Sequence, residues 1–163
     1  MKTFSRQAQD TLIQLSRSCP AVVVTGPRQS GKTTLVRHIF PDKPYITLED
    51  LDTREFATTD PRGFLSTYPD GAVLDEVQRC PGLFSYLQTR LDANPQRMGQ
   101  FILTGSQQFG LLSGISQSLA GRVAKLSLLP FTLSECISGG IMPQNLDDFL
   151  LRGLYPPVHD RTL

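Results

Sequence analysis

The sequence predicts an α/β protein, in which a mostly parallel five-stranded sheet forms the middle layer of a three-layer α/β/α sandwich. Five short apolar runs, rich in β-branched residues, are separated by segments whose apolar residues recur at helical spacing. Strands that alternate with helices in this way form parallel sheets covered on both faces. The length of 163 residues suits one domain with a substantial core. Right-handed crossovers then bring the carboxyl ends of the strands to one edge, where ligands bind.

The predicted elements follow one another along the chain. Phe4, Ala8, Leu12 and Leu15 recur at helical spacing and predict a helix over residues 3–18. The five predicted strands are Ala21–Thr25, Tyr45–Leu48, Ala72–Leu74, Phe101–Leu103 and Val123–Leu129. The other helices of this region are expected around Asp52–Phe56 and Pro61–Tyr68, over Leu83–Leu91 and over Phe109–Leu119.

Composition limits the classes of function. The formal net charge is +1, so the chain lacks the basic footprint that binds nucleic acid through electrostatics alone. Cys19, Cys80 and Cys136 are far apart, which predicts free thiols rather than a zinc site or a disulfide framework. No apolar run approaches the ~18 residues of a membrane span, and polar residues interrupt the N-terminus where a secretory signal would be apolar. These features predict a cytoplasmic protein.

The strongest functional signal is the glycine-rich loop that follows the first strand and opens a helix. It has the pattern Gly-x-x-x-x-Gly-Lys-Thr of a phosphate-binding P-loop (Walker A), and its residues are Gly26, Pro27, Arg28, Gln29, Ser30, Gly31, Lys32, Thr33 and Thr34. The two glycines let the backbone N–H groups point at phosphate oxygens, and the helix N-terminus adds to the attraction. Lys32 is predicted to bind the β- and γ-phosphates, and the Thr33 hydroxyl to bind Mg²⁺. A tight turn without a ligand is the alternative, but it does not explain the Lys-Thr pair.

A second signal is the apolar third strand, which ends in the carboxylates of Asp75 and Glu76 (Walker B). Asp75 is predicted to hold Mg²⁺ opposite Thr33, directly or through a water molecule. Glu76 is predicted to orient and partly deprotonate the water that attacks the γ-phosphate. Two solvated acids at a strand end are the alternative, which the upstream P-loop disfavours.

Hydroxyl side chains follow the fourth strand. If the sheet has the order 5-1-4-3-2, they lie beside the strand that leads into the P-loop, close to the γ-phosphate and the attacking water. Ser106 is predicted to be the polar sensor at this position, and Thr104 is the second candidate. A simple turn at the strand end is the alternative.

Arg122 lies between the last helix of the core and the fifth strand, at the edge of the domain. From there it would reach the triphosphate of a neighbouring subunit as an arginine finger, a contact that raises the rate of phosphoryl transfer ~10³-fold or more. A solvated surface arginine is an equal alternative. His38 and His159 have no partners at the spacing of a metal site or an activated nucleophile, and the sequence leaves the direction of Arg79 open.

Taken together, these motifs resemble those of the AAA+ ATPases, and more narrowly those of a family of poorly characterised prokaryotic AAA+ proteins. The resemblance covers nearly the whole chain, and the segments that carry it are Gly26–Leu35, Val73–Gln78, Ile102–Ser106, Leu119–Val123, Leu129–Glu135 and Gly153–Pro156. It implies ATP and Mg²⁺ as ligands, the strand order 5-1-4-3-2, and catalysis by Glu76.

The resemblance also implies a domain organisation. Residues 1–130 are expected to form the ATPase core, and residues 131–163 the start of a helical lid with helices over Thr132–Ile137 and Leu146–Leu151. Members of the family usually continue into a C-terminal domain that resembles restriction-endonuclease folds. The lid, which normally supplies a second sensor arginine, is therefore expected to be incomplete.

The leading hypothesis is an ATPase that hydrolyses ATP to ADP and phosphate with Mg²⁺, in a homo-oligomer where Arg122 acts in trans. The second hypothesis is a nucleotide-dependent switch or interaction module with little turnover, which the incomplete lid favours. A P-loop kinase is disfavoured, because it would need a substrate pocket and basic lid residues in place of a water-activating Asp-Glu pair. A GTPase is disfavoured because the chain lacks an Asn-Lys-x-Asp element to read guanine.

Overall fold

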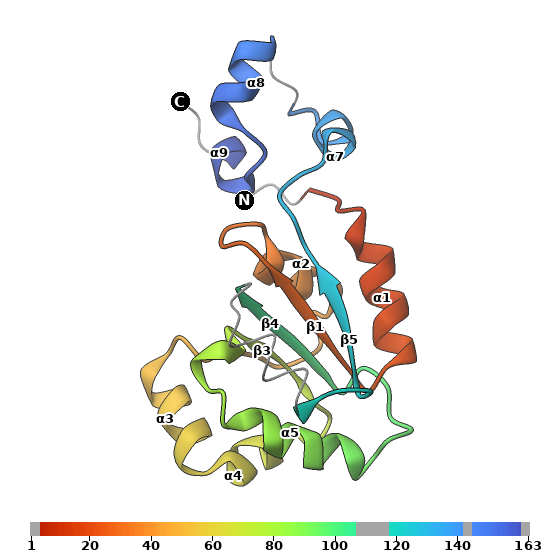
Figure 1. The fold of residues 1–163 in the computed structure, drawn as a ribbon, viewed down its shortest axis with the longest axis vertical. Coiled ribbons are helices and arrows are strands. Elements are labelled where there is room, and N and C mark those ends of the chain that lie inside the picture. Colours follow the sequence, from red (N-terminus) through yellow and green to blue (C-terminus); the bar gives the residue numbers. More distant parts are fainter. Residues whose placement is uncertain (1–3, 107–117, 142–144, 161–163) are drawn as a thin grey trace.

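The five predicted strands form one sheet in the computed structural model, which describes residues 4–106, 118–141 and 145–160 (Figure 1). The strands are β1 Ala21–Gly26, β2 Tyr45–Thr47, β3 Ala72–Asp75, β4 Phe101–Ser106 and β5 Val123–Ser127. Every pairing is parallel, and the order is β2-β3-β4-β1-β5. The fold class and the strand order 5-1-4-3-2 are thus confirmed.

Helices occupy most of the predicted helical segments. They are α1 Ala8–Ser18, α2 Lys32–Ile39, α3 Leu51–Thr59, α4 Pro61–Ser66, α5 Leu83–Asp92, α7 Leu133–Ser138, α8 Leu146–Arg152 and α9 Pro156–Asp160, with a 3-10 turn, η1, over Val77–Arg79. The helix predicted over Phe109–Leu119 falls mainly on residues 107–117, outside the described part of the chain, and α9 was not predicted. None of the helices in the described ranges is long and apolar enough to cross a membrane.

The two faces of the sheet carry separate apolar cores, as the alternation of side chains along a strand requires. Val22 and Val24 of β1 pack on one face with Leu12 of α1 and with Leu35 of α2. Val23 packs on the other face in a larger cluster that includes side chains of α3, α4 and α5. This arrangement is the predicted three-layer sandwich, with helices on both faces of the sheet (Figure 1).

The N-terminal helix is shorter than predicted. The sequence predicted residues 3–18, but α1 begins at Ala8. The residues before it make tertiary contacts instead: the Gln7 N–H donates to Glu135 Oε1 at 2.8 Å, and the buried Arg6 side chain contacts the same carboxylate. Phe4 packs edge-on against Phe131 at a ring-centroid distance of 5.3 Å. These long-range contacts hold the segment out of the helix, although its apolar spacing is helical.

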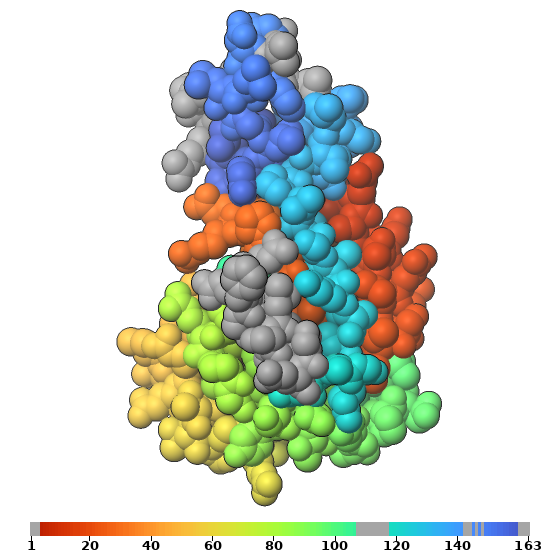
Figure 2. Space-filling view, in the orientation of Figure 1, coloured from red at the N-terminus to blue at the C-terminus, as the bar shows by residue number. Residues whose placement is uncertain are grey.

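Residues 131–141 and 145–160 form a group of short helices beyond the carboxyl edge of the sheet (Figure 1). In Figure 2 these residues, in blue, lie directly against the orange residues of the P-loop region. The Phe131 N–H donates to the Leu154 carbonyl oxygen at 2.9 Å, which joins the first and last parts of this group. Glu135 is buried, accepts the Arg6 Nε–H at 3.1 Å and completes a capping box with Thr132. One ion pair therefore links the N-terminal segment to the helical group.

Glu135 makes the stability of this link depend on pH. Burial alone would raise the pKa of Glu135, but the N–H groups of Thr132 and Gln7 and the guanidinium of Arg6 hold it below its ordinary value of 4.5. A carboxyl group whose pKa is lowered in the folded state stabilises the fold above its unfolded pKa. That contribution is lost as the pH falls through the folded-state pKa.

We expect Glu135→Gln to lower the free energy of unfolding by about 2 kcal/mol at neutral pH, because hydrogen bonds to a charged acceptor are lost. The difference from the parent chain should shrink below about pH 4.5, where the parent's own carboxyl group becomes protonated. Urea unfolding, followed by circular dichroism from neutral pH to below about pH 4.5, measures this difference in the free energy of unfolding. Glu55→Gln, at an exposed position on α3, is the control and should change little. A deficit of the same size at neutral and acid pH would contradict the role given to Glu135.

Candidate functional site

The P-loop connects the carboxyl end of β1 to the N-terminus of α2, and its two motif glycines are required by the backbone. Gly26 has φ +152°, and a Cβ there would lie 2.0 Å from the Leu128 carbonyl oxygen. Gly31 has φ +92° and stands at the N-cap of α2. Larger residues at these positions would displace the adjoining chain or strain the turn. The loop therefore has the strand-loop-helix geometry that the sequence predicted.

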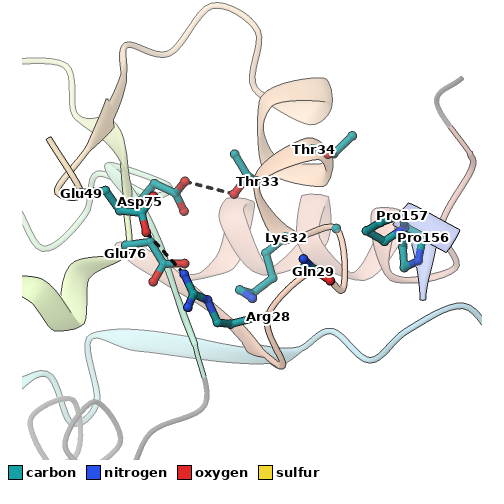
Figure 3. A pocket seen from close by; sticks show the side chains of 11 residues that line it. Arg28, Gln29, Lys32, Thr33, Thr34, Glu49, Asp75, Glu76, Pro156 and Pro157 are labelled. Carbon is teal, nitrogen blue, oxygen red and sulfur yellow. Dashed lines mark hydrogen bonds and ion pairs between the residues drawn. The ribbon is translucent and has the colours of Figure 1, made fainter. Parts of the chain in front are cut away.

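Lys32 lies inside the loop rather than in solvent. Its side chain is buried, and Nζ donates to the carbonyl oxygens of Gly26 at 3.1 Å and Pro27 at 2.8 Å. Burial lowers the pKa of Lys32, while the carboxylates of Glu76 and Asp75 act in the opposite direction. The ammonium group is thus held close to the loop and within the field of both acids (Figure 3).

Asp75, at the end of β3, accepts hydrogen bonds from three hydroxyl groups. Thr33 Oγ1 donates to Oδ2 at 3.0 Å, Tyr45 Oη donates to the same oxygen at 2.5 Å, and Thr104 Oγ1 donates to Oδ1. Burial and the bond to Asp75 raise the pKa of Tyr45 well above its ordinary value, so its hydroxyl stays a donor. Thr33 and Asp75, predicted to share a metal ion, do lie side by side (Figure 3).

Glu76 follows Asp75 in a left-handed backbone conformation, with φ 57°, which is uncommon for a residue other than glycine. Gln78 Nε2 donates to Glu76 Oε2 and also, at 3.0 Å, to Ser106 Oγ. Ser106 is paired with Gly26 in the register of β4 and β1, beside the P-loop as predicted. The amide of Gln78 therefore connects the predicted base to the predicted sensor.

Two adjoining cavities open around these residues. The larger, of about 580 Å³, has a volume within the range of small-molecule sites and is lined by P-loop residues, by Asp75 and Glu76, and by Pro156 and Pro157 of α9 (Figure 3). The second, of about 440 Å³, shares Arg28 and Glu76 with the first. Its other lining side chains include Arg54, Gln78, Arg79 and Ser106. Glu76 and Arg28 thus line both the P-loop cavity and a second cavity that carries three arginines.

The remaining P-loop residues differ in their exposure. Arg28 is 76% exposed and lies 3.8 Å from Glu49, which lies at the same distance from Arg79. Gln29 has φ 64° and, with Thr34, lines the P-loop cavity. Ser30 Oγ is buried and has no hydrogen-bond partner among the described residues.

Arg122 lies at the opposite edge of the sheet from the P-loop. It precedes Val123, which pairs with Ala21 at the amino end of β1, so the length of this strand, roughly 17 Å, separates it from Gly26. Its guanidinium binds Asp92 on α5 at 2.5 Å and 3.0 Å. Arg122 is therefore out of reach of the P-loop of its own chain.

Sequence reasoning missed four residues of this region: Arg6, Tyr45, Gln78 and Pro156. Tyr45 stood in a predicted strand, and Gln78 lay between the third predicted strand and the helix predicted over Leu83–Leu91. No local pattern shows which side chains from other elements either residue will meet. Pro156 belongs to the unpredicted helix α9, and its Cγ lies 3.8 Å from the position of a Cβ on Gly31. His38 is exposed on α2, and His159 Nε2 lies 2.9 Å from the Gly153 carbonyl oxygen. Among the described residues no cluster of three His, Cys, Asp or Glu side chains has the arrangement of a metal site.

The parallel sheet and the P-loop together define a nucleotide-binding fold of the P-loop ATPase type. A family model described as an AAA domain matches residues 18–137. The chain belongs to this AAA domain family, which confirms the AAA assignment made from the motifs and implies nucleotide binding.

Two curated relatives are similar to this chain in sequence, and two solved structures are similar to it in fold. Uncharacterized proteins of Mycobacterium bovis and Mycobacterium tuberculosis are each 35% identical over 155 residues, which cover 93% of this chain but only 33% of either relative. The Walker-type ATPase of Pyrococcus abyssi has a similar fold, with a TM-score of 0.63 and 17% identity, over 94% of this chain and 65% of that one. AMPPCP-bound DnaA from Aquifex aeolicus matches with a TM-score of 0.59 and 16% identity, over 94% and 56% of the two chains.

The hydrogen bond from Tyr45 to Asp75 is open to a direct test of stability. We expect Tyr45→Phe to lower the free energy of unfolding by about 1.5 kcal/mol, because a bond to a charged acceptor is lost while the ring remains. Tyr86→Phe is the matched control, since Tyr86 is exposed on α5, and it should stay within about 0.5 kcal/mol of the parent. Chemical denaturation of the three proteins measures both values. Equal stability of Tyr45→Phe and Tyr86→Phe would show that the bond to Asp75 contributes nothing.

Proposed function

We propose that this domain binds ATP with Mg²⁺ in the P-loop cavity and hydrolyses it to ADP and phosphate. The observation that carries the proposal is that one cavity is lined both by Lys32 and Thr33 of the P-loop and by Asp75 and Glu76 at the end of β3. Phosphate-binding groups and a general-base candidate thus face the same space. Membership of the AAA domain family supports the nucleotide, and the chemistry of the site supports its hydrolysis.

The donor set at Thr33 and Asp75 fits Mg²⁺. A hydroxyl and a carboxylate stand 3.0 Å apart, and hard oxygen ligands of this kind, with phosphate oxygens and water, are what Mg²⁺ prefers. When bound, the ion would neutralise charge on the β- and γ-phosphate oxygens. Thr33 and Asp75 would hold it, and Tyr45 and Thr104 would fix the orientation of the Asp75 carboxylate.

Glu76 is the proposed general base. Its Oε2 accepts the amide of Gln78, which orients the carboxylate and leaves Oε1 to accept a proton from the attacking water. Lys32 would bind the β- and γ-phosphates, exchanging its contacts with the Gly26 and Pro27 carbonyl oxygens for contacts with phosphate oxygens. Ser106, which already accepts from Gln78, would act as the polar sensor beside this water.

The hydrogen bond from Gln78 to Glu76 also favours a second candidate function. While Gln78 binds Glu76, one carboxylate oxygen is engaged within the protein, as a resting switch would require. In that case the domain would bind ATP and change its contacts with little turnover. The chain spans 33% of the length of its mycobacterial relatives, so both candidate functions are proposed for this domain alone.

Arg122 is proposed to act on the nucleotide of a neighbouring subunit. Arg122 lies too far from the P-loop of its own chain to contact a nucleotide there, so it could contribute to hydrolysis only in a neighbouring subunit. The ion pair with Asp92 is exposed at the edge of the domain, and exposed pairs of this kind contribute little to stability. A triphosphate could therefore replace Asp92 as the partner of the guanidinium.

The roles of Lys32 and Glu76 predict different losses. We expect Lys32→Ala to abolish ATP binding, because the loop loses its ammonium group. Glu76→Gln should bind ATP within a few-fold of the parent but hydrolyse it at least about 100-fold more slowly, because general-base catalysis is lost. Calorimetric binding and steady-state phosphate release separate the two effects.

Glu49→Gln is the control, since Glu49 lines the same cavity outside the motifs; it should keep most of the activity. Hydrolysis by Glu76→Gln at the parent rate would exclude Glu76 as the base. A parent chain that binds ATP without releasing phosphate at any protein concentration would favour the switch.

Catalysis in trans makes the specific activity depend on association. We expect phosphate release per molecule to rise with protein concentration in the parent and to stay low in Arg122→Ala, with unchanged ATP affinity. An equimolar mixture of Arg122→Ala and Lys32→Ala should recover activity, because one variant keeps a working P-loop and the other a working arginine.

The matched control is Arg97→Ala, which removes another exposed arginine paired with an aspartate, Asp70. It should hydrolyse ATP like the parent. Failure of the mixture to recover activity, with the parent's activity rising with concentration, would assign the trans contact to another residue.

A further inference from the structure

Arg6 lies outside every motif, yet its side chain is buried against the outer surface of the P-loop. Its Nη1 donates to the Ser30 carbonyl oxygen at 2.8 Å, and its Nη2 donates to the Leu129 carbonyl oxygen at 2.7 Å. Its Nε donates to Glu135 at 3.1 Å, and the guanidinium carbon lies 4.9 Å from the centre of the Phe131 ring. Only 8% of the residue is exposed. A charge buried to this degree needs such partners to be tolerated.

The bond to Ser30 determines how one peptide group of the loop is turned. In a trans peptide the C=O and the following N–H point in opposite directions, and no cis peptide occurs in the described residues. The Ser30 oxygen faces Arg6, so the Gly31 N–H faces away from it. Gly31 lines the P-loop cavity and Arg6 does not. The Gly31 N–H is therefore directed to the side where phosphate oxygens are expected.

We propose that Arg6 is a positioning residue for phosphate binding, acting through the Ser30–Gly31 peptide. This inference rests on the proposed function, because it requires that the loop binds the phosphates of a nucleotide. Without the bond from Arg6 the peptide can rotate, and a rotated peptide presents a carbonyl oxygen to the phosphates where it should present an N–H. The left-handed conformation of Gly31 makes such a rotation inexpensive, since glycine has few steric barriers.

The surroundings of Arg6 are suited to this role. Glu135 accepts the Arg6 Nε–H and balances the charge of the guanidinium, and the N–H groups of Gln7 and Thr132 donate to its carboxylate. An ideal Cβ on Gly31 would lie 3.2 Å from Arg6 Nη1, so the arginine packs directly on the glycine. The loop is thus supported by an N-terminal residue that is in turn held by the helical group at residues 131–141 and 145–160.

The test compares Arg6→Ala and Arg6→Lys with Glu135→Gln, which loses the ion pair but keeps the donor to Ser30. Calorimetric titrations with ATP and with inorganic tripolyphosphate, which has no base or sugar, report phosphate binding. All are run at one temperature below the unfolding midpoints of all the proteins. We expect Arg6→Ala to bind both ligands about tenfold more weakly, the cost of one hydrogen bond to a charged group. Arg6→Lys should lose less, because its ammonium can still donate to Ser30.

Glu135→Gln separates positioning from general support of the fold. It should lose thermal stability but bind both ligands within about twofold of the parent. If it loses as much affinity as the Arg6 variants, support of the helical group explains the effect and the inference is overturned. Unchanged affinity in Arg6→Ala would overturn the inference about Arg6 but leave the proposed function intact. A parent chain that binds neither ligand would overturn the proposed function and this inference with it. Should Arg6→Ala not fold, Arg6→Met, which keeps an apolar stem but cannot donate to Ser30, takes its place in the comparison with Glu135→Gln.

Discussion

The Asp75 carboxylate accepts hydrogen bonds from Thr33, Tyr45 and Thr104, which belong to α2, β2 and β4. Three elements that are distant in sequence therefore meet at one buried anion. Such an anion is costly to bury unless its oxygens are satisfied, so the three hydroxyl groups and the carboxylate depend on one another. The position of the P-loop helix relative to the sheet edge, and with it the geometry of the cavity, depends on this set of bonds.

A second set of contacts supports the loop from its outer side. Arg6 joins the P-loop to Glu135, and through it to the helical group that also brings Pro156 to the mouth of the cavity. The two sets differ in kind. The contacts of Asp75 lie where a cation and phosphates would bind, whereas those of Arg6 act on the loop backbone from behind. Together they hold the loop between the sheet edge and the C-terminal helices.

Much of the core was predictable because its signals are local. Alternation or continuity of apolar residues marked all five strands within one or two residues at most ends. The helix predicted over Leu83–Leu91 is also present, as α5, and buries Leu83, Phe84, Leu87 and Leu91. The helix expected over residues 3–18 was wrong in its first turn, because Arg6 and Gln7 bond to Glu135, 128 or more residues away. The helix α9 is only five residues long and has no periodic pattern to reveal it.

The sequence by itself determined which groups the chain offers to a nucleotide. The spacing of Gly26, Gly31, Lys32 and Thr33 is a local property, because a loop, a helix N-terminus and their glycines are set by neighbours along the chain. Only the tertiary structure decided which side chains from other parts of the chain contact these motif residues or lie next to them. The register of β4 against β1 and of β2 against β3 brings Ser106 and Tyr45 to the site, and the fold of the C-terminal helices brings Glu135 to Arg6. These partners lie far apart in sequence, and only the packing of separate elements, which no local pattern encodes, places them in contact.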